Sequence, residues 1–239
     1  NRHTADAYRE VATMVPMNLK KILTVLIRKW DVYNIKLILR GVYAERSPDD
    51  IRADLVQVGE LDPQKIGELA EARSLEEAIS NLDGTPYSRL AESLQIFDQT
   101  RNLTVLEAKL DNILYEDAWK NATSQPVDEN LLALKNYLAT NIDVVNLKFV
   151  FRAKKDGLAA GSIENYIVKG GGLQESFIKS TLEVDTVDNV VASLEGTKYY
   201  QPVIGAVPEY ESTGSILPIE LALDGYLARF GKDISITQP

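Results

Sequence analysis

The feature that most constrains this chain is a ten-residue pattern that occurs twice. DVYNIKLILR begins at Asp31 and DVVNLKFVFR begins at Asp143, an offset of 112 residues. The same offset holds without a gap beyond the decamer, and 15 positions of 31–87 are identical to their counterparts in 143–199. Unrelated segments of ordinary composition would share roughly 3 or 4. The pattern therefore indicates an internal duplication.

A shorter match predicts a third unit. EAKLDNIL at 107–114 is similar to ELALDGYL at 220–227, at an offset of 113. We divide the chain into three repeat units, the first shortened at its N-terminal end and the third only begun: residues 1–103, 104–216 and 217–239. A third DxxN motif is expected about 112 residues after Asp143. Because the first residue is Asn rather than Met, we expect the chain to be part of a longer product.

The hydrophobic spacing predicts an all-α fold. Apolar residues recur at helical intervals over 16–40, 104–120 and 127–153, whereas alternation of period two is scarce, so strands should be few. Ser47 before Pro48 is typical of a helix start, and Thr85 before Pro86 repeats that pattern, with Gly84 ending the preceding helix.

Glycines of the duplicated segment predict turns rather than a ligand site. KGGGL at 169–173 lacks the Lys-Ser/Thr pair of a phosphate-binding loop, and no strand precedes it. We interpret it as a turn that ends a helix. Gly171 aligns with Gly59, to which we assign the same role.

The composition excludes several classes of function. The chain has no cysteine and only one histidine, His3, which disfavours disulfides, zinc sites and catalysis by a histidine or thiolate. We expect no catalytic residue, no cofactor and no metal. A net charge of −9 disfavours nucleic acid as a partner. No apolar run approaches the ~18 residues of a membrane span, and no secretion signal is evident.

The acid and the amide of the decamer lie beside its apolar stripe. On a helical wheel, Asp31 falls within about 60° of Ile35 and Ile38, and Asn34 lies next to Ile38. Each Asp should therefore be buried and accept hydrogen bonds from a neighbouring helix terminus or a cationic side chain. We interpret the motif residues as structural polar residues that fix how helices cross in each unit: Asp31, Asn34, Arg40, Asp143, Asn146 and Arg152.

Two alternatives for these residues remain open, contact with a partner protein and acid–base catalysis by Asp31 or Asp143. Catalysis lacks support from a neighbouring histidine, cysteine or serine motif. The basic side chains at Lys36 and Arg40, and at Lys148 and Arg152, lie on the opposite side of the wheel, where cations on an exposed helix face need no specific role.

Taken together, the motifs resemble one known family. The doubled DxxNΦKΦΦΦR, the GGxL after its second copy, the LxGTxY in both units and the ExxLD helix starts resemble the C subunit of archaeal-type (A-type) ATP synthases, and its eukaryotic relative, the d subunit of the vacuolar proton ATPase. The resemblance extends from about Tyr8 to Pro239. The order of the motifs and their spacing carry it, because no single motif is specific.

The resemblance implies a non-catalytic coupling subunit. It implies an all-helical protein whose three similar units surround a pseudo-threefold axis as a funnel. Its partners would be the central-shaft subunits and the proteolipid rotor ring. It would be a collar that couples ion transport to ATP synthesis or hydrolysis. It would bind no nucleotide and be peripheral, on the cytoplasmic side of the membrane. The alternative function is a generic cytosolic helical-repeat scaffold that binds unrelated protein partners.

Overall fold

The computed structural model describes residues 17–56, 58–124 and 129–237, with side chains over 27–56, 58–124 and 131–233. The described residues form helices and connecting loops with no strand, which confirms the all-α prediction. The chain divides into two compact units, Asn1–Pro126 and Val127–Pro239. Pro16 and His3 lie outside the described residues.

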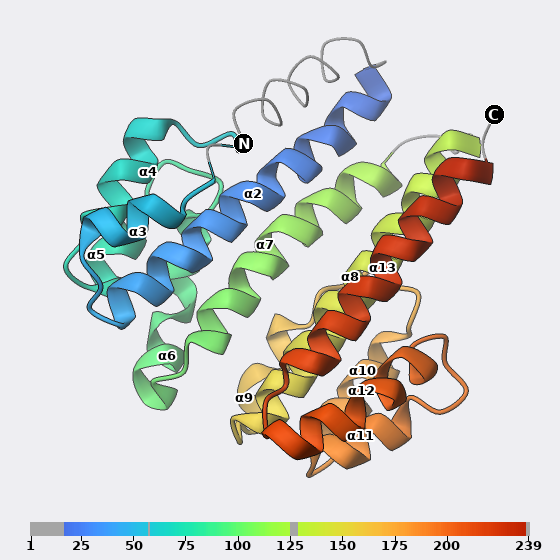
Figure 1. Ribbon diagram of the computed structural model, residues 1–239. Helices are drawn as coiled ribbons and strands as arrows, with labels where there is room; N and C mark the ends of the chain where they lie inside the picture. The colour runs from blue at the N-terminus through green and yellow to red at the C-terminus, as the bar shows by residue number, and fades with distance from the viewer. Residues whose placement is uncertain (1–16, 57, 125–128, 238–239) are drawn as a thin grey trace. The chain divides into compact units, whose positions relative to one another are not determined.

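Unit 1 is built on a long helix, α2, with a second long helix, α7, packed against it (Figure 1). Between them in sequence come short helices, of which α3, α4 and α5 pack on α2, and η1 and α6 pack on α7. The bounds are α2 Met17–Tyr43, α3 Pro48–Asp54, α4 Pro63–Ala70, α5 Leu75–Ser80, η1 Ser88–Ser93, α6 Leu94–Thr100 and α7 Leu103–Thr123.

Unit 2 also begins and ends with a long helix and has short helices between them. The long helix α8 is followed by short helices, of which α10 and α11 pack on it, and the long helix α13 then packs on both α8 and α12. The bounds are α8 Glu129–Lys155, α9 Ala160–Ile163, η2 Glu164–Tyr166, α10 Glu175–Glu183, α11 Val187–Ser193, α12 Tyr200–Thr213 and α13 Leu217–Thr237. The 14 residues of α12 are continuous, whereas unit 1 has η1 and α6 at this point.

Local sequence explains where several short helices begin. Ser47 accepts a hydrogen bond from the Asp50 N–H with Pro48 in the first turn, which confirms that predicted helix start. The prediction for Pro86 was wrong, because η1 begins only at Ser88. Thr85 instead accepts a bond from the N–H of Tyr87, which holds the chain in a turn before the helix.

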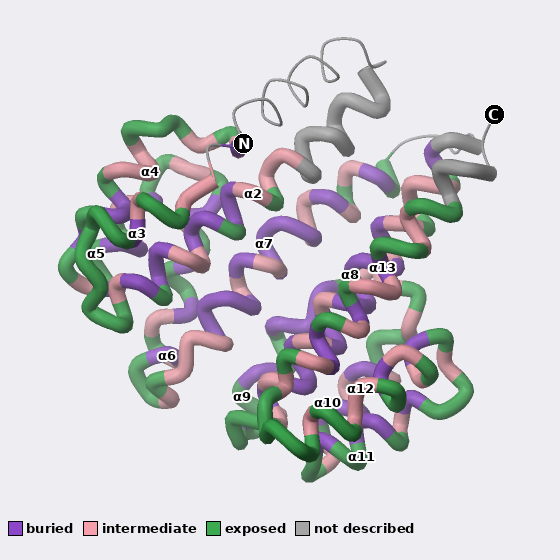
Figure 2. Tube along the Cα trace, in the orientation of Figure 1, coloured by how far each residue is buried: buried purple, intermediate pink, exposed green. Residues whose placement is uncertain are grey.

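The cores of the units lie along their long helices. Figure 2 shows buried residues recurring along α2, α7 and α8, whereas the outer surfaces of the short helices are exposed. Ile35 and Ile38 of α2 are buried, as are Leu147 and Val150 at the same positions of α8. Asp31 and Asp143 belong to the same buried faces, so both cores contain an acidic side chain.

Candidate functional site

In unit 1, Asp31 is almost completely enclosed, with 1% of its surface exposed. Its Oδ2 accepts hydrogen bonds from the backbone N–H of Glu60 at 3.0 Å and from the hydroxyl of Tyr87 at 3.1 Å. Its Oδ1 accepts a third from the N–H of Leu61 at 3.1 Å. These hydrogen bonds connect α2 to both the loop before α4 and the turn before η1.

In unit 2, Asp143 makes the corresponding contacts 112 residues later. Its Oδ1 accepts a bond from the N–H of Leu173 at 2.9 Å, and its Oδ2 accepts one from the hydroxyl of Tyr199 at 2.7 Å. The expected donors for each Asp were a helix terminus or a cation. The structure supplies a phenol and loop amides instead, and the amides of Leu61 and Leu173 belong to the residues directly before the caps of α4 and α10. Each of these buried donors is satisfied by the carboxylate.

The two asparagines of the decamers hold the same loops at a second point. Asn34 donates from Nδ2 to the carbonyl of Val56 at 2.7 Å and accepts from the N–H of Val56 at 3.0 Å. Asn146 makes the same pair of bonds to Val168, both 2.9 Å long. An amide side chain satisfies one residue's N–H and C=O together, which suits a loop that has no strand neighbour.

We call these residues the buried polar cluster of each unit: Asp31, Asn34 and Tyr87 in unit 1, and Asp143, Asn146 and Tyr199 in unit 2. Sequence reasoning recognised the tyrosines as part of a repeated motif but gave them no role. The sequence feature that could have indicated the pairing is the constant separation of the two residues. Each tyrosine follows its aspartate by 56 residues.

The glycines before these amides are needed for close approach. A Cβ on Gly59 would lie 2.0 Å from Oδ1 of Asp31, and one on Gly171 would lie 2.1 Å from Oδ1 of Asp143. The interpretation of Gly171 as the end of a helix was wrong, because it lies in the loop between η2 and α10. Only a residue without a side chain lets the loop backbone approach closely enough to donate hydrogen bonds to the carboxylate.

Burial determines the acidity of these groups. Desolvation raises the pKa of Asp31 and of Asp143, against the opposing effect of the amide and phenol hydrogen bonds. The pKa values of Tyr87 and Tyr199 are also raised, first by burial and then by the adjacent carboxylate. Each phenol therefore remains protonated, so it serves as a permanent hydrogen-bond donor.

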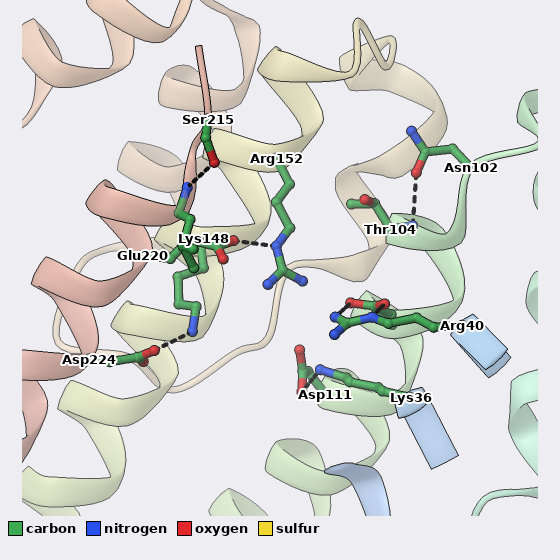
Figure 3. Close-up of polar contacts among 12 residues, drawn as sticks. Lys36, Arg40, Asn102, Thr104, Asp111, Lys148, Arg152, Ser215, Glu220 and Asp224 are labelled. Carbon is green, nitrogen blue, oxygen red and sulfur yellow. Dashed lines mark hydrogen bonds and ion pairs between the residues drawn. The ribbon is translucent and has the colours of Figure 1, made fainter. Parts of the chain in front are cut away.

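The basic side chains of the decamers pair with the next long helix, as Figure 3 shows. Arg40 binds Glu107 through two parallel bonds, from Nε at 2.6 Å and from Nη2 at 2.7 Å. In unit 2, Nε of Arg152 donates to Oε1 of Glu220. Two parallel bonds from a guanidinium are among the stronger polar contacts in proteins.

A second ion pair lies one helical turn away in each unit. Nζ of Lys36 is 2.6 Å from Oδ1 of Asp111, and Nζ of Lys148 is 2.7 Å from Oδ2 of Asp224. In each unit the two cations are four residues apart on one helix, and their acidic partners are four residues apart on the other. The first cation pairs with the second acid and the second cation with the first acid, as expected for antiparallel helices. The interpretation that these cations have no specific role was wrong, because they pair with acids of α7 and α13, although the Arg40 side chain remains 56% exposed.

One neighbour of the buried polar cluster differs between the units. In unit 1, Arg28 of α2 forms an ion pair with Glu60 at 2.9 Å. In unit 2, Lys198 lies beside Tyr199 and donates to Thr140 at 3.0 Å. Its charge opposes the rise in the pKa of Asp143. The aspartate contacts thus recur although the nearby cation comes from a different element.

Within the ranges that the structure describes, no group of acidic and histidine side chains has the arrangement of a metal site. None of the described helices is sufficiently long and apolar to cross a bilayer.

The whole chain, residues 1–239, matches the family model described as ATP synthase (C/AC39) subunit. The chain belongs to that family. The match agrees with the resemblance inferred from the repeated motifs. It places the buried polar clusters and the ion pairs of α7 and α13 within a member of the C/AC39 family.

Curated members of the C/AC39 family are similar over nearly all of this chain. The C subunit of the A-type ATP synthase of Methanocaldococcus jannaschii is 34% identical over 239 residues, which are 99% of this chain and 59% of that protein. Those of Methanosphaera stadtmanae and Pyrococcus abyssi are 33% and 28% identical, each over 98% of this chain and 61% of the relative. The chain thus spans about three fifths of their length.

Proposed function

We propose that this chain is part of a non-catalytic coupling subunit of a rotary A-type ATP synthase. The subunit is a collar that links the central rotor shaft to the membrane proteolipid ring. It lies peripherally on the cytoplasmic side of the membrane and contributes to ion transport coupled to ATP synthesis or hydrolysis. The observation that carries this proposal is the family match over the whole chain, together with relatives named as the C subunit of A-type ATP synthases.

The contacts of each unit suit a part that transmits torque. A coupling element has to resist twisting, and long packed helices joined by buried polar contacts supply stiffness. In unit 1, α2 is held to its loops by Asp31 and Asn34 and to α7 by Lys36 and Arg40. Both sides of one long helix are therefore fixed by directed contacts.

The repeat division is part of the proposal. Residues 1–103, 104–216 and 217–239 correspond to two units and the start of a third, which would together surround a pseudo-threefold axis. Each ExxLD helix begins a repeat in sequence but pairs in space with the DxxN helix before it. A repeat in this arrangement thus contributes its first helix to the preceding compact unit.

Co-purification from membranes tests the function. An affinity tag on the full-length protein should recover the central-shaft subunits and the proteolipid ring, identified by mass spectrometry. A tagged cytosolic helical protein of similar acidity is the control for nonspecific capture. Recovery of neither the shaft nor the ring, with unrelated proteins in their place, would support the generic scaffold and refute the coupling role.

A further inference from the structure

Three aspartates of this chain are followed directly by a glycine. The pairs are Asp83–Gly84, Asp156–Gly157 and Asp224–Gly225. In such a pair the glycine nitrogen can attack the carboxyl carbon of the aspartate and close a five-membered imide, because no side chain on the glycine hinders the attack. The reaction needs an accessible carboxyl group and a free backbone N–H, so the fold determines which pair reacts.

The first pair lies in the turn between α5 and η1, and both of its residues are exposed. Gly84 has a φ of +76°, and a Cβ added to it would meet no atom within 4 Å, so there is room around its amide. Within the described part of the chain, neither the carboxylate of Asp83 nor the N–H of Gly84 has a hydrogen bond or an ion pair. The two reacting groups are therefore adjacent, accessible and not engaged by other groups.

The other two pairs are held by local contacts. The N–H of Gly157 donates to the carbonyl of Lys154 at 3.3 Å. Gly225 lies inside α13, where each N–H donates to the carbonyl four residues earlier. The carboxylate of Asp224 is also 2.7 Å from Nζ of Lys148. These contacts have to break before the imide closes, so both pairs react only through local opening.

Unit 2 has the same turn with a different acid. Glu195 and Gly196 occupy the positions of Asp83 and Gly84, and the φ of Gly196 is +81°. Glutamate has one more methylene group than aspartate, so its carboxyl group would have to close a six-membered imide, which forms much more slowly. The duplicated turn is thus reactive in unit 1 only.

We propose that Asp83 is a modification site at which isoaspartate forms selectively. The nitrogen of Gly84 bonds to Cγ of the protonated Asp83 carboxyl group, and the amide proton leaves with the carboxyl hydroxyl as water. Water then adds to one of the two imide carbonyls and breaks one bond to the nitrogen. Addition at the main-chain carbonyl leaves the chain running through Cβ and Cγ, which is isoaspartate, whereas addition at Cγ restores aspartate. No reactant other than water is required.

The modified turn leads directly to the buried polar cluster of unit 1. The N–H of Thr85 donates to the carbonyl of Leu82 at 3.0 Å, and Oγ1 of Thr85 accepts a bond from the N–H of Tyr87. Isoaspartate adds a methylene group to the backbone inside this turn, so the Thr85 bond is lost. Tyr87 then no longer keeps its hydroxyl on Asp31, and the cluster loosens. This inference does not rest on the coupling role.

Incubation of the purified full-length protein in heavy-oxygen water at neutral pH tests the site. Each cycle of closure and hydrolysis introduces one solvent oxygen, which mass spectrometry detects after digestion in ordinary water. We expect incorporation at Asp83 to be at least about tenfold faster than at Asp156 or Asp224. In denaturant the three rates should become similar. Equal rates in the folded protein would overturn the proposal.

Asp83→Glu gives unit 1 the acid of unit 2 and is the matched control. After ageing, the amides of Glu60 and Leu61, which donate to Asp31, should exchange hydrogen about tenfold faster in the modified wild type than in fresh protein. Aged Asp83→Glu should show no change. Unchanged exchange in the modified wild type would overturn the proposed effect on the cluster. Because the protein is purified alone, failure here is distinguishable from failure of the coupling role, which the membrane co-purification measures.

Discussion

The hydroxyl of Tyr199 donates a 2.7 Å hydrogen bond to Oδ2 of Asp143, and both side chains are buried. In unit 1, Tyr87 makes the same bond to Asp31 across the same separation of 56 residues. The bond joins the first long helix of a unit to the turn that leads into the later helices. It is therefore a tertiary contact that closes the unit.

Removing the carboxylate should destabilise unit 2. Asp143→Ala leaves the Leu173 N–H and the Tyr199 hydroxyl without an acceptor, so we expect a loss of about 1–3 kcal/mol in the free energy of unfolding. Denaturant unfolding of the full-length protein measures it, with Glu209→Ala at an exposed position of α12 as the control. The effect of Tyr199→Phe should not add to that of Asp143→Ala, because both remove one contact. Full additivity would contradict the pairing.

The loop glycine should not tolerate a methyl group. Gly171→Ala puts a Cβ 2.1 Å from the carboxylate oxygen of Asp143, so the loop has to move and its hydrogen bonds weaken. We expect a loss of about 1–3 kcal/mol, as for other overpacked sites. Gly161→Ala is the matched control, since no neighbouring atom lies within 4 Å of that Cβ and helical alanine is favourable. A thermal melt in which Gly171→Ala equals the control would show that the loop does not press on the carboxylate.

Lowering the pH should stabilise the folded state through protonation of Asp143. Burial raises the pKa of this carboxyl above its unfolded value, so the ionised form carries a penalty at neutral pH. The penalty is relieved as the pH falls from the folded pKa towards the unfolded one. The stability of the wild type relative to Asp143→Asn should therefore increase between pH 7 and about pH 5. Urea unfolding of both proteins at each pH measures this difference. A difference that decreases towards acid would mean that the Leu173 and Tyr199 hydrogen bonds outweigh desolvation.

The ion pair between α2 and α7 should matter more than a surface pair. Arg40→Met keeps the aliphatic part of the side chain but removes the paired bonds to Glu107. The Glu107 side chain is 7% exposed, whereas that of Arg40 is 56% exposed, so only the acid is left buried without its partner. We expect a loss of about 2 kcal/mol. Arg46→Met breaks an exposed pair with Asp54 and should cost about 1 kcal/mol or less. If calorimetry shows equal losses of stability for Arg40→Met and Arg46→Met, the burial of Glu107 does not strengthen its ion pair.

The sequence was sufficient to predict the fold class and the buried side of the decamer. The apolar spacing around Asp31 and Asn34 determines which face of α2 packs inward, and both residues are buried. Their donors could not be predicted, because the loop amides are brought to the carboxylate only by tertiary packing. The close approach at Gly171 was missed for the same reason, since in one sequence it resembles an ordinary turn.

The ion pairs could have been found from the sequence. Lys36 and Arg40 are four residues apart, as are Glu107 and Asp111 on a later helix, with charges of opposite sign. Antiparallel helices bring two such pairs into register. A helical wheel treats each helix by itself, so cations that face a partner helix were assigned to an exposed surface.

The central claim is that the full-length protein couples rotation to ion transport without taking part in ATP chemistry. Its most direct test compares reconstituted enzyme with and without this protein, measuring ATP hydrolysis and ATP-driven ion uptake into vesicles in the same preparation. The account predicts that hydrolysis persists without the protein while ion uptake is lost, and that adding it back restores uptake. Uptake that continues in its absence, or hydrolysis that stops with it, would contradict the claim.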